Sequence, residues 1–316
     1  MKASSRKMPE PLSIFLMGAT ATGKSDIAMK VAERFGGEII NADSMQVYKG
    51  LDIGTAKPSP EERRQIPHHL IDVLEISEKL DVFKYKNLAE IAVNEIRKNG
   101  KIPIFAGGSG MYLKAVIDDL DPLPSDPELY SRLSEEYSDS NGIERLKRFL
   151  GDKSPADLSK TYPNLRRMLR AAELVILNER SACLQRTRWD NSSSIGRNLC
   201  FIICRDRKEL KQRIADRTKQ MLEKGWIQEA ETMIKKGLLN SPTARQVIGY
   251  GIIAEYLSGQ TTYEAMRDRI ISATIKLARK QDTWFRNKHK DTIRVEMPKD
   301  EDLLFKTVEK RIESGI

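Results

Sequence analysis

The 316-residue sequence predicts an α/β fold, in which a parallel sheet has helices on both faces and an all-helical insertion domain interrupts the chain. Short stretches that are apolar throughout alternate with amphipathic helical stretches, which is typical of strands buried on both sides. Glycine-rich turns follow the first and third of these apolar stretches. The alternation stops near residue 121, and strand-like sequence returns only near residue 199.

The N-terminal part supplies most of the expected sheet. Strands are predicted at 12–17, 37–42 and 102–106, with a helix at 83–99 that ends at Gly100. Ligands bind at the carboxyl ends of parallel strands. The segments that follow these strands should therefore lie together at one edge of the sheet.

The insertion begins at a proline-rich boundary, Pro122, Pro124 and Pro127. Residues 128–188 have the pattern of short helices, and 191–196 form a polar linker. The expected organisation is a core in two parts, 1–120 and 197–316, around an insertion, 121–196.

After the insertion, a strand is expected at 199–204, and the chain after Arg205 is expected to be helical. Helices are predicted at 207–224, 227–236 and 262–288.

The strongest motif directly follows the first predicted strand and matches G-x-x-x-x-G-K-[ST]. Its residues are Gly18, Ala19, Thr20, Ala21, Thr22, Gly23, Lys24 and Ser25. Such a turn between a strand and a helix directs backbone N–H groups at a phosphate. Lys24 adds a full charge, and Ser25 offers a hydroxyl ligand for Mg²⁺. The core is therefore expected to be P-loop NTPase-like.

Two further segments belong to the same predicted edge. Asp43 follows the second strand, where a carboxylate is suited to act as a general base or to hold magnesium through water. The alternative is that Asp43 forms a local turn or a helix cap. Gly107–Gly110 follows the third strand and carries Ser109, where many P-loop nucleotidases have a magnesium-binding aspartate. This difference makes nucleotide hydrolysis a weaker hypothesis.

Positive charge points to a large anionic partner. The chain has 54 Lys and Arg against 45 Asp and Glu, and its pI is about 9.3. Arg217 shares a helix face with Leu210 and Ile214, where its partner is either a diphosphate or a structural carboxylate. Two basic clusters favour RNA, although solvated helix faces would explain either cluster alone. They are Arg166, Arg167 and Arg170, and Arg279, Lys280, Trp284, Arg286, Lys288 and Lys290.

Other classes are not favoured. No apolar run approaches the ~20 residues of a membrane span, and residues 1–11 lack the apolar region of a signal peptide. Three cysteines, Cys183, Cys200 and Cys204, favour neither a disulfide framework nor a metal knuckle. We expect a cytoplasmic protein that is a monomer and does not bind membranes.

With these motifs assembled, the chain closely resembles the tRNA dimethylallyltransferases, also called tRNA isopentenyltransferases. The matching segments run from residue 12 to about residue 290. They are the phosphate loop, 41–58 (NADSMQVYKGLDIGTAKP), 67–72 (PHHLID), 107–113 (GGSGMYL), 245–250 (RQVIGY) and 281–286 (QDTWFR). No Cys/His zinc module follows Met297, which resembles the bacterial type.

The resemblance implies transfer of a dimethylallyl group from dimethylallyl diphosphate to N6 of the adenine next to the tRNA anticodon, with Mg²⁺ as cofactor. It implies that Asp43 is the general base, that Ser109 orients the amine and that Arg217 assists the leaving diphosphate. The anticodon stem-loop would be bound by the insertion and by several core residues. The expected tRNA-binding residues are Asp43, Ser44, Met45, Gln46, Arg166, Arg167, Arg170, Arg245, Gln246, Gly249, Tyr250, Trp284 and Arg286.

Two segments depart from the family pattern. Ser109 stands where relatives more often have threonine and keeps the hydroxyl, whereas Ser181–Gly196 does not match the usual continuation, which affects the details of tRNA binding and not the chemistry. Three alternatives are an adenylate prenyltransferase of the cytokinin-forming type, a P-loop small-molecule kinase, and an RNA-binding module that only senses nucleotide.

Overall fold

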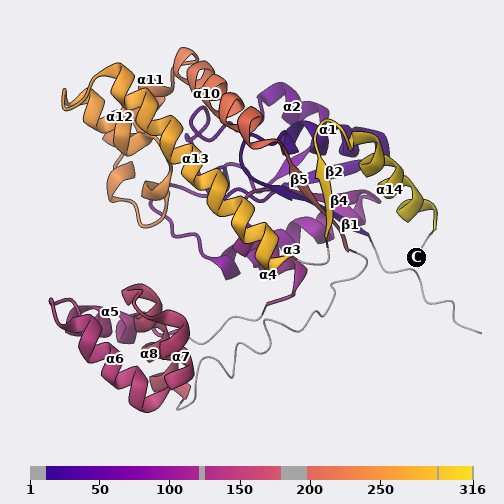
Figure 1. The fold of residues 1–316 in the computed structure, drawn as a ribbon. Coiled ribbons are helices and arrows are strands. Elements are labelled where there is room, and N and C mark those ends of the chain that lie inside the picture. The colour runs from indigo at the N-terminus through magenta and orange to yellow at the C-terminus, as the bar shows by residue number, and fades with distance from the viewer. Residues whose placement is uncertain (1–11, 121–124, 179–197, 290–291, 315–316) are drawn as a thin grey trace, which may run out of the picture. The chain divides into compact units, whose positions relative to one another are not determined.

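A computed structural model describes residues 12–120, 125–178, 198–289 and 292–314 and divides the chain into two compact units (Figure 1). One unit comprises Met1–Ile117 and Ser194–Ile316, and the other comprises Asp118–Ser193. Several predicted features lie outside the described residues. They are Pro122, Pro124, Cys183, Lys290, the linker 191–196 and the departure at 181–196.

The first unit is built on a sheet that has six parallel strands within the described residues. The strands are β1 (Ser13–Gly18), β2 (Gly37–Asn41), β3 (His68–His69), β4 (Ile102–Gly107), β5 (Asn198–Cys204) and β6 (Ile293–Glu296). Their order is β3-β2-β4-β1-β5-β6, so β1 lies between β4 and β5. The predicted α/β fold with a parallel sheet is confirmed.

Side chains of β1 point alternately to the two faces of the sheet, and helices cover both faces. Ile14 and Leu16 pack with α1 (Lys24–Phe35) and α14 (Glu301–Glu313) on one face. Phe15 and Met17 point to the other face, which is covered by α3 (Val82–Lys98) and α4 (Gly110–Ile117). Because its side chains are apolar on both faces of the sheet, β1 is buried along its whole length.

Two helices from the second half of the chain, α10 (Arg207–Glu223) and α13 (Tyr263–Lys288), pack against the loop that follows β1. Helices α11 (Trp226–Lys235) and α12 (Tyr250–Leu257) lie between them in the sequence and are labelled at one end of α13 in Figure 1. A small apolar cluster joins Ala19 in the loop to Ile214 in α10 and Ala278 in α13. The loop after β1 is thus packed from outside by two helices.

Several elements were not predicted individually. The edge strands β3 and β6 and the helices α2 (Pro60–Gln65), α4, α12 and α14 have no counterpart among the predicted ranges. The prediction that the chain is helical after Arg205 is wrong at β6. An edge strand of four residues is too short to give a periodic signal, and its pairing with β5 is a long-range contact.

The second unit is helical over its described residues. It contains α5 (Pro127–Glu136), α6 (Gly142–Lys153), α7 (Pro155–Thr161) and α8 (Leu165–Asn178), which share a core around Leu146, Leu150 and Met168. Asp126 caps α5 by accepting hydrogen bonds from the backbone N–H groups of Glu128 and Leu129.

Candidate functional site

The loop that follows β1 has the conformation of a phosphate-binding turn. Gly23 has a φ of 94°, which favours glycine, and it directly precedes α1, whose N-terminus points its free N–H groups at the loop. The Thr22 hydroxyl donates to the Ala19 carbonyl at 2.9 Å and closes the turn from inside.

Lys24 is held within this turn without an acidic partner. Its Nζ donates to the Ala19 carbonyl oxygen at 2.5 Å, and the residue has no ion pair within the described residues. Burial and, to a smaller extent, neighbouring Arg217 lower the pKa of the Lys24 ammonium group from 10.5 to about 7, and Asp43 opposes the shift. The charge of Lys24 therefore lacks a counter-ion, which a bound diphosphate would supply.

Two arginines of α10 reach the same loop. Arg213 Nε donates to the Ala21 carbonyl at 3.0 Å, and Arg217 Nη1 donates to the Thr20 hydroxyl at 3.3 Å. Neither guanidinium forms an ion pair with a described carboxylate, so the structural carboxylate considered for Arg217 is not present among those residues. Lys24, Arg213 and Arg217 thus concentrate positive charge where the phosphate loop predicts an anion.

Asp43 stands beside this positive cluster. Its Oδ1 accepts a hydrogen bond from the Met45 N–H at 2.8 Å, which is the local turn contact considered as the alternative. Its other carboxylate oxygen has no hydrogen bond to a described residue. Asn41 fixes the Asp43 backbone, since its Oδ1 accepts from Asp43 N–H at 2.9 Å. The turn therefore orients Asp43 and leaves one oxygen available.

Ser109 lies next to Asp43 and is part of the same network. Its Oγ accepts a hydrogen bond from the Ser44 N–H at 3.0 Å, and its own N–H donates to the Ala42 carbonyl at 3.0 Å. These contacts join the loop after β2 to the loop after β4. The prediction that the three loops meet at one edge of the sheet is confirmed.

Two cavities meet at Asp43. The larger, of about 550 Å³, is lined by the phosphate loop, including Lys24 and Ser25, and by Arg213 and Arg217. The smaller, of about 350 Å³, has Ser109 and a largely apolar wall. That wall includes Met45, Ile214, Met221, Trp226, Val247, Ile248 and Leu277. Thr20, Asp43, Arg217 and Gln281 are among the residues that line both cavities, so the Asp43 carboxylate lies where the cationic cluster meets the largely apolar wall.

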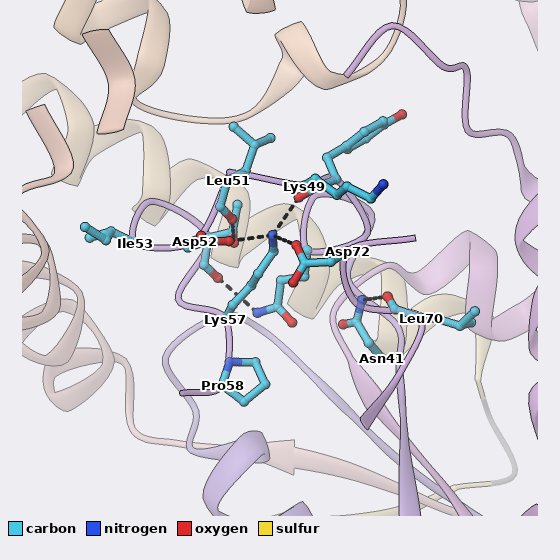
Figure 2. Close-up of polar contacts among 12 residues, drawn as sticks. Asn41, Lys49, Leu51, Asp52, Ile53, Lys57, Pro58, Leu70 and Asp72 are labelled. Atoms are coloured by element: carbon cyan, nitrogen blue, oxygen red, sulfur yellow. Dashed lines mark hydrogen bonds and ion pairs between the residues drawn. The ribbon is translucent and has the colours of Figure 1, made fainter. Parts of the chain in front are cut away.

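A segment that we call the strap, residues 51–58, forms part of both walls. Lys57 anchors it: the side chain is 1% exposed, and Nζ donates to the Tyr48 carbonyl, to Asp52 and to Asp72 (Figure 2). A second anchor is Glu229 in α11, whose carboxylate accepts the backbone N–H groups of residues 52–54 at 2.7–3.0 Å.

Gln46 is fastened to the strap. Its side-chain Nε2 donates to the carbonyls of Thr55 at 3.0 Å and Ala56 at 3.1 Å. Ser44 and Met45, which were also predicted to bind tRNA, form part of the wall of the smaller cavity.

Three residues predicted to contact tRNA are buried by packing within the first unit. Tyr250 is 0% exposed and donates its hydroxyl hydrogen to Glu229. Gly249 is buried against the ring of Trp226. Trp284 is half-buried, with its ring against Gly110. The apolar faces of the Tyr250 and Trp284 rings pack against other residues of the first unit, because burying an aromatic ring is more favourable than exposing it to water.

Exposed polar side chains remain near the smaller cavity. Arg245 and Gln246 are exposed on a short 3₁₀ helix, Ala244–Gln246, and Gln246 forms part of the cavity wall. Arg286 is exposed near the end of α13, where it pairs with Asp282 at 3.0 Å.

The three arginines of α8 have different environments. Arg166 and Arg167 are exposed, whereas Arg170 is half-buried and forms an ion pair with Glu173. Glu173 is buried and also accepts hydrogen bonds from the Ser125 hydroxyl and the Asp126 N–H. Arg170 therefore balances a buried carboxylate of its own unit, and its role in tRNA binding stays a prediction.

Sequence reasoning missed Arg213 and Gln281 as members of the site. Arg213 lies four residues before Arg217, so both are on one helix face, and this spacing could have placed Arg213 in the site together with Arg217. The only sequence signal for Gln281 was its place at the start of the segment 281–286 that resembles the family, and it did not indicate which groups the side chain contacts. Its contacts are with residues 173 and 261 positions away, and only the tertiary structure brings them together.

Comparisons with known proteins agree with this geometry. Residues 46–288 match the sequence model of a family described as IPP transferase. A tRNA dimethylallyltransferase of Carboxydothermus hydrogenoformans is 40% identical over 276 residues, covering 86% of this chain and 88% of the relative. One of Kocuria rhizophila is 36% identical over 275 residues, covering 86% and 85%.

Solved structures give the same result. A full-length tRNA isopentenylpyrophosphate transferase of Bacillus halodurans has a TM-score of 0.70 at 32% identity, covering 97% of this chain and 98% of that one. A eukaryotic dimethylallyltransferase, described as acting on tRNA, has a TM-score of 0.83 at 25% identity, covering 96% and 80%. The resemblance drawn from the sequence motifs is confirmed.

Proposed function

This chain belongs to the IPP transferase family, and from that premise we propose that it transfers a dimethylallyl group from dimethylallyl diphosphate to N6 of the adenine adjacent to the tRNA anticodon. The observation that carries the proposal is the position of Asp43 between the cluster of Lys24, Arg213 and Arg217 in one cavity and the largely apolar wall of the other. A group transfer between an anionic donor and a flat, uncharged base needs both surfaces at one carboxylate.

The cationic cavity holds the donor. Backbone N–H groups of the phosphate loop, with Lys24 and Arg217, bind the diphosphate and stabilise the charge that it gains as the bond from carbon to oxygen breaks. Arg213 adds a second guanidinium to the same wall. These interactions strengthen as the leaving group becomes more negative, so they favour the transition state over the bound substrate.

The apolar cavity receives the adenine, which leaves its stack to reach the protein interior. The amine nitrogen attacks C1 of the dimethylallyl group, the electron pair of the broken C–O bond stays on the diphosphate, and Asp43 takes the N6 proton. Ser109 holds a hydroxyl beside Asp43 that can orient the amine, and its link to Ser44 fixes that position.

The residues present fit Mg²⁺ bound mainly by the diphosphate and water, a mode that this ion favours. Ser25 is exposed at the larger cavity, and its hydroxyl makes no hydrogen bond with a described residue. No cluster of three or more metal-ligating side chains occurs among the described residues, so protein ligands alone do not form the site. The ion would neutralise diphosphate charge.

Transfer RNA binds through exposed basic and polar side chains. Arg245, Gln246 and Arg286 offer such groups in the first unit, and Arg166 and Arg167 offer them in the second. The protein acts as a monomer in the cytoplasm. Among the described residues, every helix is too short or too polar to cross a membrane.

The proposal is tested by offering the protein dimethylallyl diphosphate and Mg²⁺ with either unmodified tRNA or AMP. Mass spectrometry of the digested products should reveal dimethylallyl-adenosine from tRNA, located next to the anticodon, and little from AMP. Preferential transfer to AMP would instead identify an adenylate prenyltransferase. ATP-dependent phosphorylation without prenylation would identify a kinase, and binding without any reaction would identify an RNA-binding module.

A further inference from the structure

One face of α13 runs along both loops of the site. Ala278 packs against Ala19 of the phosphate loop, and Trp284, six residues later, packs against Gly110 of the Ser109 loop. A Cβ at Gly110 would lie 2.1 Å from Trp284 Cδ1, so the helix touches this backbone directly. Residues 278, 281 and 284 follow a spacing of three, which places them on the same side of the helix.

Gln281 lies between these two contacts and bonds to both loops at once. Its Oε1 accepts the Thr20 N–H at 2.9 Å, and its Nε2 donates to the Gly108 carbonyl at 3.1 Å. An amide N–H can only donate and a carbonyl can only accept, so these partners fix which way the carboxamide faces. A side chain with one donor and one acceptor at its end is required.

Thr20 is held at two points by this arrangement. Its backbone N–H is taken by Gln281, and its hydroxyl accepts from Arg217 Nη1 at 3.3 Å. Gln281 also lines both cavities. The carboxamide therefore joins the loop that holds the donor to the loop that carries Ser109, at the place where the two substrates would meet.

We propose that Gln281 is a positioning residue that sets the spacing between the diphosphate loop and the Ser109 loop, and so controls the rate of transfer more than the binding of either substrate. This inference rests on the proposed function. It assigns the face of α13 at 278–284 to the internal geometry of the site, although the segment 281–286 resembles a tRNA-contacting one.

Rate should respond strongly, because a displacement of about 1 Å between reacting groups can cost on the order of 10²-fold. We expect Gln281→Ala to lower kcat by about 30- to 300-fold, with the KM values for dimethylallyl diphosphate and tRNA within about 3-fold of wild type. Gln281→Asn, whose shorter side chain cannot span both loops, should be similarly impaired. Ser272→Ala, at an exposed position of the same helix, is the control.

Gln281→Glu gives a second readout that loss of packing would not produce. The carboxylate keeps the acceptor for Thr20 but turns an acceptor toward the Gly108 carbonyl. Protonation restores a donor there. The ratio of Gln281→Glu to wild-type kcat should therefore rise as pH falls from 8 toward 5.5, because the protonated carboxyl group can again donate to the Gly108 carbonyl.

The outcomes separate this inference from the proposed function. Failure of the wild-type protein to prenylate tRNA would overturn the function itself. If wild type is active, unchanged kcat in Gln281→Ala, or a defect confined to KM for tRNA, would overturn the inference and make Gln281 a substrate contact or a dispensable residue. A flat pH ratio for Gln281→Glu would overturn it as well, even if Gln281→Ala does not fold.

Discussion

Asp43 connects the local turn after β2 to the chemistry of the site. One carboxylate oxygen is used by the Met45 N–H, and the other faces the cavities with no hydrogen bond to a described residue. The turn contact holds the side chain in one orientation without consuming its capacity to accept a proton. A local structural role and a catalytic one are thus compatible in the same residue.

We predict that Asp43→Ala lowers turnover of tRNA by ~10²–10⁴-fold, because proton removal from N6 loses its base, with little change in tRNA affinity. Steady-state prenylation and filter binding measure the two effects. Asp268→Asn, an exposed carboxylate of α13, is the control. Normal turnover in Asp43→Ala would remove Asp43 from the role of base.

Burying the charged Lys24 ammonium group without a counter-ion destabilises the folded protein, and a bound diphosphate would remove that penalty. Burial lowers its pKa to about 7, so between pH 7 and 10.5 the unfolded chain binds more protons than the folded one. The free energy of unfolding therefore rises with pH between pH 7 and 10.5, and below pH 7 the full cost of burying the charged Lys24 is present. The charge is retained because an anion must be bound there.

We predict that Lys24→Met raises the free energy of unfolding at pH 6.5 by ~1–3 kcal/mol, less than the full pKa shift would give because the residue is only partly buried. The gain should shrink as pH approaches 10. Urea unfolding in phosphate-free buffer measures it, with the exposed Lys219→Met as control. A gain that does not vary with pH would contradict the assigned cause.

At the scale of elements, the strap shows how a site wall without secondary structure is kept rigid. Lys57 and Glu229 reach it from two sides, and between them they satisfy backbone and carboxylate groups of residues 48–54. Buried polar groups are costly unless they are paired, so each anchor stabilises one conformation strongly. Gln46 inherits that rigidity through its bonds to Thr55 and Ala56.

We predict that Lys57→Met lowers the free energy of unfolding by ~1–3 kcal/mol, because it leaves the buried Tyr48 carbonyl without its donor and leaves Asp72 with Arg63 as its remaining partner among the described residues. Lys49→Met, two residues before the strap, is a matched control. Its ion pair with Glu75 is more than half exposed and should contribute less than about 1 kcal/mol. Equal losses in the two variants, measured by chemical denaturation, would contradict the importance of Lys57.

At the scale of the whole molecule, the two units contribute different kinds of basic residue. Those around the larger cavity, Lys24, Arg213 and Arg217, face a compact anion. Those of α8 are divided between solvent and the interior, since Arg166 and Arg167 are exposed and Arg170 pairs with Glu173. Clusters of basic residues in the sequence therefore differ in their surroundings: one lines a cavity suited to an anion, and the other is divided between solvent and an internal ion pair.

We predict that Arg166→Ala and Arg167→Ala weaken tRNA binding and reduce its salt dependence by about one unit of slope each, if each contacts one phosphate. Arg170→Ala should instead lower the thermal stability of the second unit, because it leaves a buried carboxylate without its cation. Binding titrations at several salt concentrations, with thermal unfolding, distinguish these effects. An unchanged slope for both exposed arginines would exclude them from the interface.

The sequence alone determined the features that depend on local order. Eight consecutive residues form the phosphate loop, strands that are apolar throughout require a covered parallel sheet, and the carboxyl-edge rule brought Asp43 and Ser109 to that loop. Each of these follows from neighbours in the chain or from the geometry of parallel strands. The family resemblance rested on the same short segments.

Only the tertiary structure decided which side chains face the site and which face the core. Tyr250 and Trp284 sit in motifs that resemble contact residues, yet packing against Glu229 and Gly110 withdraws them from solvent. Gln281 joins two loops that lie 173 and 261 residues away along the chain. Burial and long-range hydrogen bonds depend on how elements meet in space, and periodicity along the sequence does not encode that.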